Sequence, residues 1–127
     1  MSDDLNVSVE EGRIKIFLHG RFVGEDLQLV ISGGDRPHIG AVAVSFCLPS
    51  LKDADVPAVT TSLVTVPGHK EGPLTQRAAE AIAAATGRTV SVSCGIHLES
   101  ISQEEIQKIE QLVGRLLDDF LQRFSVG

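Results

Sequence analysis

The chain has no tryptophan, no tyrosine and only five phenylalanines among its 127 residues. Single-stranded nucleic acids bind proteins largely by stacking their bases on aromatic side chains, so this composition is unfavourable for such a partner. The charge is unfavourable as well, because 11 Lys and Arg face 17 Asp and Glu and leave a formal net charge of −6. We therefore expect no nucleic-acid partner.

Cysteine and long apolar runs are also scarce. Cys47 and Cys94 each lie inside a strand-like apolar segment, so we expect them to be reduced and buried rather than part of a secreted disulfide framework. The longest apolar run, 39–48, is interrupted by Gly40 and Ser45 and is shorter than the roughly 20 residues of a membrane span. The first residues show no signal-peptide pattern. These features predict a cytoplasmic protein with no membrane partner.

Periodicity predicts six strands. Apolar and polar residues alternate over 5–10 and 13–18, with a break at Gly12, which predicts a hairpin with one face in solvent. A glycine-containing turn is expected at 19–24. The remaining strands are predicted at 27–31, 41–47, 59–66 and 89–94.

Two segments change to a helical period. Pro73 suits the first turn of a helix and Gly87 the position after its last turn. Ser102 and Glu105 form a capping box at the start of a second, longer helix. The predicted buried positions are Leu74, Ala78, Ala81, Ile82 and Ala85 in the first helix, and Ile106, Ile109, Val113, Leu116, Phe120 and Phe124 in the second.

Five strands, a helix, a sixth strand and a second helix indicate an α+β fold. We predict a single domain over residues 1–127, with one mainly antiparallel sheet of about six strands and both helices on one face. The other face keeps a surplus of apolar residues, and covering it predicts a homo-oligomer, a dimer or larger. The residues that suggest this surplus are Val30, Ile39, Val42, Val44 and Leu63.

Three short segments at strand ends, 33–40, 67–72 and 94–97, pair glycine with histidine and contain three of the four histidines. Glycine allows backbone to come close to a partner, and histidine titrates near neutral pH and binds metals or anions. If these strand ends are neighbours at one edge of the sheet, the segments form a common site.

Each of the first two segments has two interpretations. Segment 33–40 can be a tight hairpin turn, or a binding loop in which Pro37 fixes the entry to His38. Segment 67–72 can be exposed filler with Gly72 as the helix cap. It can also be a phosphate cradle, in which Lys70 and the first amides of the helix face the anion.

The third segment places Cys94 and His97 three residues apart, which is compatible with a nucleophile and its base or with a small core cysteine beside a turn histidine. A metal held by His38, His69 and His97 is an alternative to a metal-free site. No two of these histidines have the local spacing by which zinc sites are recognised, so we predict no metal on spacing alone.

The motifs GGDRPHIGAVA at 33–43, PGHKE at 67–71 and GIH at 95–97 resemble, in this order, a small family that includes the accessory subunit of gallate decarboxylase. Its members are described as prenylated-flavin chaperone-like proteins. The resemblance implies an accessory protein, without catalytic residues of its own, that binds prenylated FMN or FMN and hands it to a UbiD-type decarboxylase of aromatic acid metabolism. By matched position it implies that the cofactor-binding residues are Gly33, Gly34, Arg36, His38, Gly40, Gly68, His69, Lys70, Glu71, Gly95 and His97.

Two other functions fit the residues. One is a metal- or histidine-dependent enzyme acting on a small phosphorylated or carboxylated metabolite, with His38, His69 and His97 as ligands or as acid and base. The other is a structural subunit whose loops dock another protein.

Overall fold

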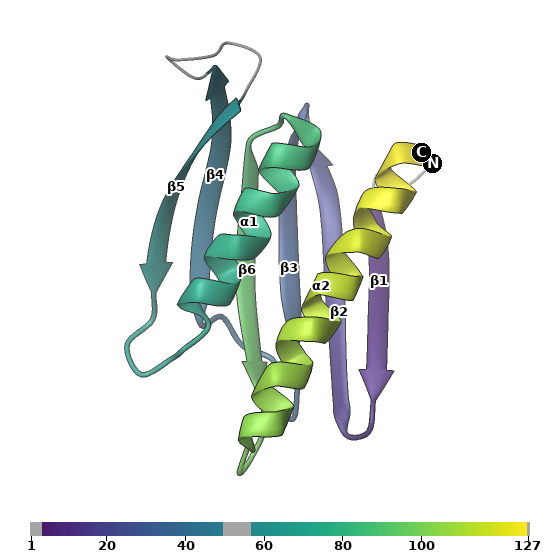
Figure 1. Ribbon diagram of the computed structural model, residues 1–127, viewed down its shortest axis with the longest axis vertical. Helices are drawn as coiled ribbons and strands as arrows, with labels where there is room; N and C mark the ends of the chain where they lie inside the picture. Colours follow the sequence, from purple (N-terminus) through teal and green to yellow (C-terminus); the bar gives the residue numbers. More distant parts are fainter. Residues whose placement is uncertain (1–3, 50–56, 127) are drawn as a thin grey trace.

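A computed structural model describes residues 4–49 and 57–126, which build one six-stranded sheet and two helices (Figure 1). The predicted α+β fold and its order of elements are confirmed. The elements are β1 (Asp4–Glu11), β2 (Ile14–Val23), β3 (Asp26–Gly34), β4 (Ala41–Pro49), β5 (Pro57–Thr65), α1 (Gly72–Thr86), β6 (Val90–His97) and α2 (Gln103–Val126).

The strand order in the sheet is β1-β2-β3-β6-β4-β5, and only the β3–β6 pair is parallel. The hairpin-turn interpretation of segment 33–40 is therefore wrong, because β6 lies between β3 and β4. Cys94 pairs with Ile31 on one side and with Ala41 on the other. The residues after Gly34 must consequently cross the end of β6 before the chain enters β4, and this crossing builds the site.

The predicted N-terminal hairpin is confirmed, with Gly12 in its turn at a φ of +60°. The turn predicted at 19–24 is wrong for most of its length, because β2 continues to Val23. Gly20 pairs with Leu29 inside the sheet, and a Cβ at Gly20 would lie 2.7 Å from a ring carbon of Phe120. This glycine makes room for a core side chain instead of reversing the chain.

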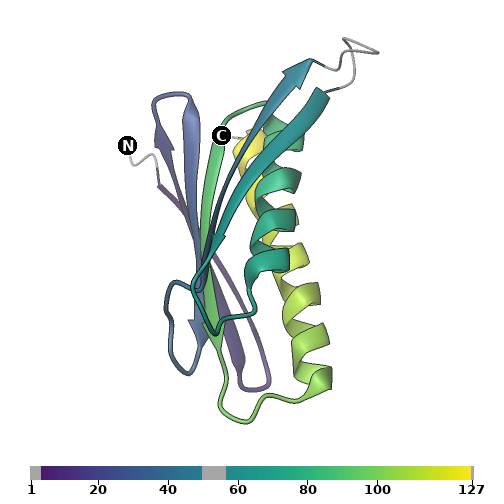
Figure 2. The same cartoon turned by 90° about the vertical axis from the view of Figure 1, so that its left-hand side faces the viewer.

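Both helices pack on the same face of the sheet, as Figure 2 shows. The predicted limits of α1 are confirmed: Pro73 lies in its first turn, and Gly87 ends it at a φ of +70°. Its predicted buried face is partly wrong, because Ala81 and Ala85 are exposed. Alanine residues occur on several sides of α1, so their spacing in the sequence does not show which side packs against the sheet. The residues of α1 that are buried are Gly72, Thr75, Ala78, Ala79, Ile82 and Ala83.

The long helix α2 begins with the predicted capping box, in which the Glu105 N–H donates to Ser102 Oγ and the Ser102 N–H donates to the Glu105 carboxylate, both at 3.1 Å. Most of the predicted stripe is buried: Ile109, Val113, Leu116 and Phe120. Two residues of the stripe are not buried: Ile106 is 39% exposed, and Phe124 is half-buried against the core. Neither helix in the described part of the chain combines the length and apolar character needed to cross a membrane.

The uncovered face of the sheet exposes apolar side chains, as predicted. Val30 and Val44 are exposed there, and Val64 of β5 is 70% exposed. Leu63 does not belong to this surface. It pairs with the fully buried Ala43, and directly paired residues share a face, so Leu63 points to the helix side.

Candidate functional site

The three glycine–histidine segments converge at one end of the sheet, the lower end in Figure 1. The His38 ring is central. Its centroid lies 4.6 Å from the ring centroid of His69 and 6.4 Å from that of His97. The predicted convergence is confirmed, and it depends on β6 lying between β3 and β4.

His38 is held at both ring nitrogens. Nδ1 lies 3.0 Å from the backbone carbonyl oxygen of Arg36, and Nε2 lies 3.0 Å from Glu71 Oε1. The Glu71 side chain is only 13% exposed, and His69 Nδ1 lies 3.9 Å from its other oxygen, Oε2. Glu71 is also the N-cap residue that directly precedes α1, and no side chain of the described residues makes a capping hydrogen bond there. The alternative in which Gly72 is the cap is therefore wrong.

Two glycines give His38 and Glu71 the space they occupy. A Cβ at Gly95 would lie 1.8 Å from the His38 carbonyl oxygen, because the crossing segment passes directly over β6. A Cβ at Gly40 would lie 2.3 Å from Glu71 Oε2. At Gly95 the obstructing atoms belong to the backbone, so this position must be glycine for the crossing to form. At Gly40 a side chain would displace the Glu71 carboxylate from its present place.

The other predicted glycines differ in what they approach. A Cβ at Gly33 would lie 2.2 Å from the Lys15 carbonyl oxygen, and one at Gly34 would lie 2.1 Å from that of His97. Their close contacts are thus with the chain's own backbone. A Cβ at Gly68 would have no neighbour within 4 Å among the residues that the structure describes, and the φ of +86° suits a turn.

His97 belongs to a second cluster beside the first. Its Nε2 lies 3.3 Å from Glu99 Oε1, and the same carboxylate accepts a hydrogen bond from Arg36. Hydrogen bonds from Arg36 and then from His97 hold the pKa of Glu99 below its ordinary value. The Glu99 N–H donates to Asp35 Oδ2 at 3.0 Å. Arg36, although 74% exposed, is therefore engaged by the protein itself.

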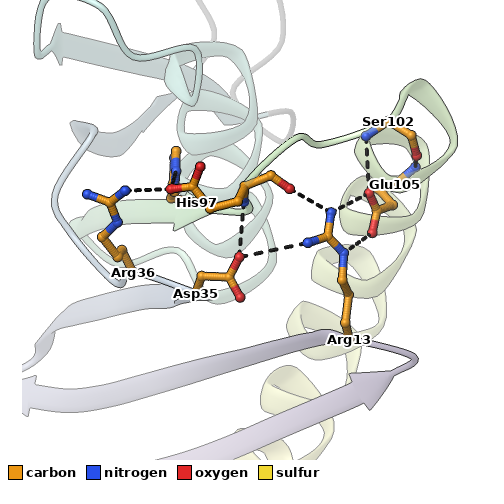
Figure 3. A network of polar contacts seen from close by, with 7 residues as sticks. Arg13, Asp35, Arg36, His97, Ser102 and Glu105 are labelled. Carbon is orange, nitrogen blue, oxygen red and sulfur yellow. Dashed lines mark hydrogen bonds and ion pairs between the residues drawn. The ribbon is translucent and has the colours of Figure 1, made fainter.

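Arg13 connects this second cluster to the start of α2 (Figure 3). Its guanidinium donates to both carboxylate oxygens of Glu105, at 2.7 and 2.8 Å, and to the Glu99 carbonyl oxygen at 2.9 Å. Asp35 Oδ2 lies 3.8 Å away. Sequence reasoning missed Arg13, because it lies in the turn after β1 and is separated from Glu105 by 92 positions. No local signal links the two residues.

The Glu105 contact predicts a pH dependence of stability. Arg13 above all, together with the Ser102 N–H, lowers the pKa of Glu105 from 4.5 to about 2. A carboxyl whose pKa is lower in the folded state stabilises the fold above its unfolded pKa and loses this effect as pH falls toward its folded pKa. We expect Glu105→Gln to be less stable than the wild type at pH 7, with the difference shrinking between about pH 5 and pH 2.

Urea unfolding midpoints of both proteins at pH 7, 4 and 2.5 measure this difference. Glu104→Gln is the matched control, since Glu104 makes no ion pair or side-chain hydrogen bond among the described residues. A wild-type advantage over Glu105→Gln that stays constant at all three pH values would contradict the assignment.

Cys94 does not act with His97 as a nucleophile and base. The two residues are three positions apart on β6, so their side chains lie on opposite faces of the sheet. Burial raises the pKa of the Cys94 thiol to about 11, which keeps it protonated and unreactive. Both cysteines are free thiols, and the predicted burial is confirmed for Cys94. It is wrong for Cys47, which is half-buried and donates from Sγ to the Ala83 carbonyl oxygen at 3.2 Å.

An apolar groove lies beside the histidines, between the starts of α1 and α2 and the end of β6. Its volume is about 410 Å³, within the range of about 300–1,000 Å³ that is usual for small-molecule sites. Lys70 lies at its edge and makes no ion pair among the described residues, whereas Arg77 lies 3.8 Å from Glu110. The groove is lined by Gly68, His69, Lys70, Glu71, Pro73, Leu74, Arg77, Ile96, His97, Leu98, Ile101, Ile106, Ile109 and Glu110.

The fold and the site define a small α+β protein that presents a polar cluster and an apolar groove at one end of a sheet, without an activated nucleophile among the described residues. The model of the prenylated flavin chaperone LpdD-like domain family matches residues 10–125, and the chain belongs to this family. The family resemblance seen in the sequence is thereby confirmed. The prediction of one domain over all 127 residues stays a prediction.

Comparison with curated proteins finds no match. Among solved structures, the chain is similar to one from a novel chaperone complex for yeast 20S proteasome assembly. The two chains are 11% identical, and the alignment covers 95% of this chain and 97% of the yeast chain with a TM-score of 0.60. This likeness shows a shared fold.

Proposed function

We propose that this protein binds prenylated FMN, or FMN, at the end of the sheet where the three loops converge, and hands it to a UbiD-type decarboxylase. The observation that carries the proposal is the apolar groove with the Lys70 cation at its edge, in a chain that belongs to the prenylated flavin chaperone LpdD-like family. When bound, the prenylated flavin would supply the decarboxylation chemistry only inside the partner enzyme.

The groove suits a flavin phosphate at one end. Lys70 provides a positive charge, and α1 begins beside it with no acidic residue in its first turn and with no capping hydrogen bond from a side chain in the described part of the chain. The amides of an uncapped helix start and a nearby cation together favour a phosphate. The phosphate-cradle interpretation of segment 67–72 is thus supported by the free helix start.

The groove suits a ring system along its walls. Ile101 and Ile106, which project from the chain around the start of α2, are exposed apolar residues that a ring would cover. Imidazoles at its polar end, from His69 and His97, offer hydrogen-bonding groups to ring oxygens and nitrogens. Of the other predicted residues, Gly40 and Gly95 leave the space that Glu71 and His38 occupy beside this polar end. An open groove also permits release of the cofactor to another protein.

Anaerobic size exclusion with FMN or reduced prenylated FMN tests the proposal. We expect flavin absorbance to elute with the wild type, and to fall at least about tenfold with Lys70→Ala, which removes a charge-assisted phosphate contact. Ile106→Glu, which places a charge on the groove wall, should also prevent binding. Transfer is then measured by adding a cofactor-free UbiD-type decarboxylase and assaying the flavin bound to it.

Two matched variants control this experiment. Lys15→Ala removes an exposed cation of β2 near Phe17, and Val23→Glu adds a charge at an exposed apolar position, both outside the groove. Both should retain flavin like the wild type. Equal retention by Lys70→Ala, Ile106→Glu and the controls would reject the groove as the binding site, and no co-elution at all would reject flavin binding.

The face of the sheet opposite the helices is a candidate surface for contact between copies of this chain. We propose a homo-oligomer, a dimer or larger, in which a second copy covers the apolar face of the sheet that carries Val30, Val44 and Val64. This face is opposite the helices, so an oligomer formed through it leaves the groove between α1 and α2 accessible. A cytoplasmic location stays a prediction.

A further inference from the structure

We propose that His38, His69 and Glu71 bind a divalent first-row transition-metal ion. One ligand atom from each of these side chains can be chosen so that all three lie within 4.8 Å of one another. Two imidazoles and one carboxylate on one side of an ion are a donor set that such metals accept, with coordination positions left open. The set differs from the three histidines considered from the sequence, because it leaves out His97 and contains Glu71.

The hydrogen bond behind His38 prepares it as a ligand. A backbone carbonyl only accepts, so the contact of Nδ1 with the Arg36 carbonyl oxygen at 3.0 Å requires a proton on Nδ1. This leaves Nε2 as the atom that faces Glu71. Metal-binding histidines are usually held in this way, with the second ring nitrogen donating to a carbonyl or carboxylate.

The distance between His38 and Glu71 fits a shared cation. Two ligand atoms that each lie about 2.1 Å from one ion are separated by about 3.0–3.4 Å at octahedral to tetrahedral angles. His38 Nε2 and Glu71 Oε1 are 3.0 Å apart. A lone pair and a carboxylate at this distance repel unless a cation lies between them, and that cation is either a proton or a metal ion.

The second carboxylate oxygen of Glu71 favours the metal ion. Oε2 is buried and has no hydrogen-bond partner among the residues that the structure describes. A single proton between Nε2 and Oε1 leaves this oxygen unsatisfied, which is costly in a buried position. A divalent ion beside the carboxylate compensates the charge on both oxygens. Gly40 keeps the volume next to Oε2 free of a side chain.

His69 belongs to the cluster around His38 and Glu71, whereas His97 belongs to the cluster around Glu99. The His69 ring is partly exposed and tilted by 34° against the His38 ring, with 4.6 Å between the centroids. Its Nδ1 already lies 3.9 Å from Glu71 Oε2, so a small rotation brings this nitrogen to the ion. His97 is farther away and is directed to Glu99. His69 also lines the groove, so the open positions of the ion would be reached from there.

Titration of the full chain with Co²⁺ tests the site without any flavin. Protein stripped with a chelator and dialysed should bind one Co²⁺ per chain, seen as a visible absorption band and by calorimetry, and Zn²⁺ should displace it. We expect His38→Ala and the isosteric Glu71→Gln each to weaken binding by about 100-fold or more. Circular dichroism and urea unfolding show whether each variant is folded.

Three variants control the ligand assignment. His97→Ala and Glu110→Gln alter a histidine and a carboxylate at the same groove, and His19→Ala alters a histidine of β2 outside it. All three should bind Co²⁺ like the wild type. Absence of saturable binding by the wild type, or unchanged affinity in folded Glu71→Gln, overturns the proposal. A loss with His97→Ala as large as with His38→Ala overturns the ligand assignment. Because no flavin is present, these results are independent of the flavin experiment.

Discussion

Replacing Gly95 by alanine is expected to lower the free energy of unfolding by about 3 kcal/mol, at the upper end of the usual cost of overpacking. The new Cβ would lie 1.8 Å from the His38 carbonyl oxygen and 2.4 Å from its carbonyl carbon. These are backbone atoms, so no rotation of a side chain relieves the collision. The crossing segment must lift away from β6, and His38 then moves away from Glu71.

Urea unfolding and nuclear Overhauser contacts between the His38 and His69 rings measure the two consequences. Gly114→Ala is the matched control, since no atom of residues 4–49 and 57–126, apart from the helix's own backbone, lies within 4 Å of a Cβ at this exposed position of α2. It should increase stability by about 0.5–1 kcal/mol, because alanine favours a helix interior over glycine. A Gly95→Ala protein with wild-type stability and intact ring contacts would show that the crossing segment is not seated on β6.

Replacing Phe120 by alanine is expected to lower the free energy of unfolding by about 3–5 kcal/mol. Phe120 is fully buried and is among the largest side chains of the core. It packs on β2 where Gly20 leaves room for its ring, so its removal opens a cavity between α2 and the sheet. The measurement is the urea midpoint, with Phe17→Ala on the exposed face of β2 as the control, expected to change stability by less than about 1 kcal/mol.

A double-mutant cycle tests the contact itself. Gly20→Ala places a Cβ 2.7 Å from the Phe120 ring and from Leu29, so it should destabilise the wild type. In the Phe120→Ala background one of these two collisions is absent, and the cost of Gly20→Ala should fall by about 1 kcal/mol or more. Equal costs in both backgrounds would show that Gly20 and Phe120 do not share this space.

Features that depend on neighbours a few positions apart were predictable. The break at Gly12, the start of α1 at Pro73 with its end at Gly87, and the Ser102–Glu105 capping box are all found where expected. Each involves contacts within about four positions of the chain. The adjacent residues alone make these conformations favourable, whatever packs around them.

Features that depend on which strands meet were not predictable from spacing. Alternation predicts that β3, β4 and β6 are strands, but many sheet orders satisfy the same alternation, and the insertion of β6 between β3 and β4 is one of them. For the same reason Gly20 suggested a turn, and Ala81 and Ala85 suggested a buried face. Both predictions were wrong because the residues that contact these positions in the folded protein are far away in the sequence.

The candidate site shows the same division. The residue types, with histidines after strands and Lys70 and Glu71 before a helix, already indicate polar chemistry at the ends of strands. The sequence does not indicate that Glu71 is directed to His38, that His97 is directed to Glu99, or that Arg13 supports this second cluster.

The helix caps, the turns and the alternation of the strands in this protein were determined by the sequence alone, because each of these depends on residues that are close together in the chain. The pairing of His38 with Glu71, the groove beside Lys70 and the role of each glycine were decided only when the whole sheet formed. These contacts join residues that are far apart in the sequence. They contribute to stability only after the strands have paired in their final order.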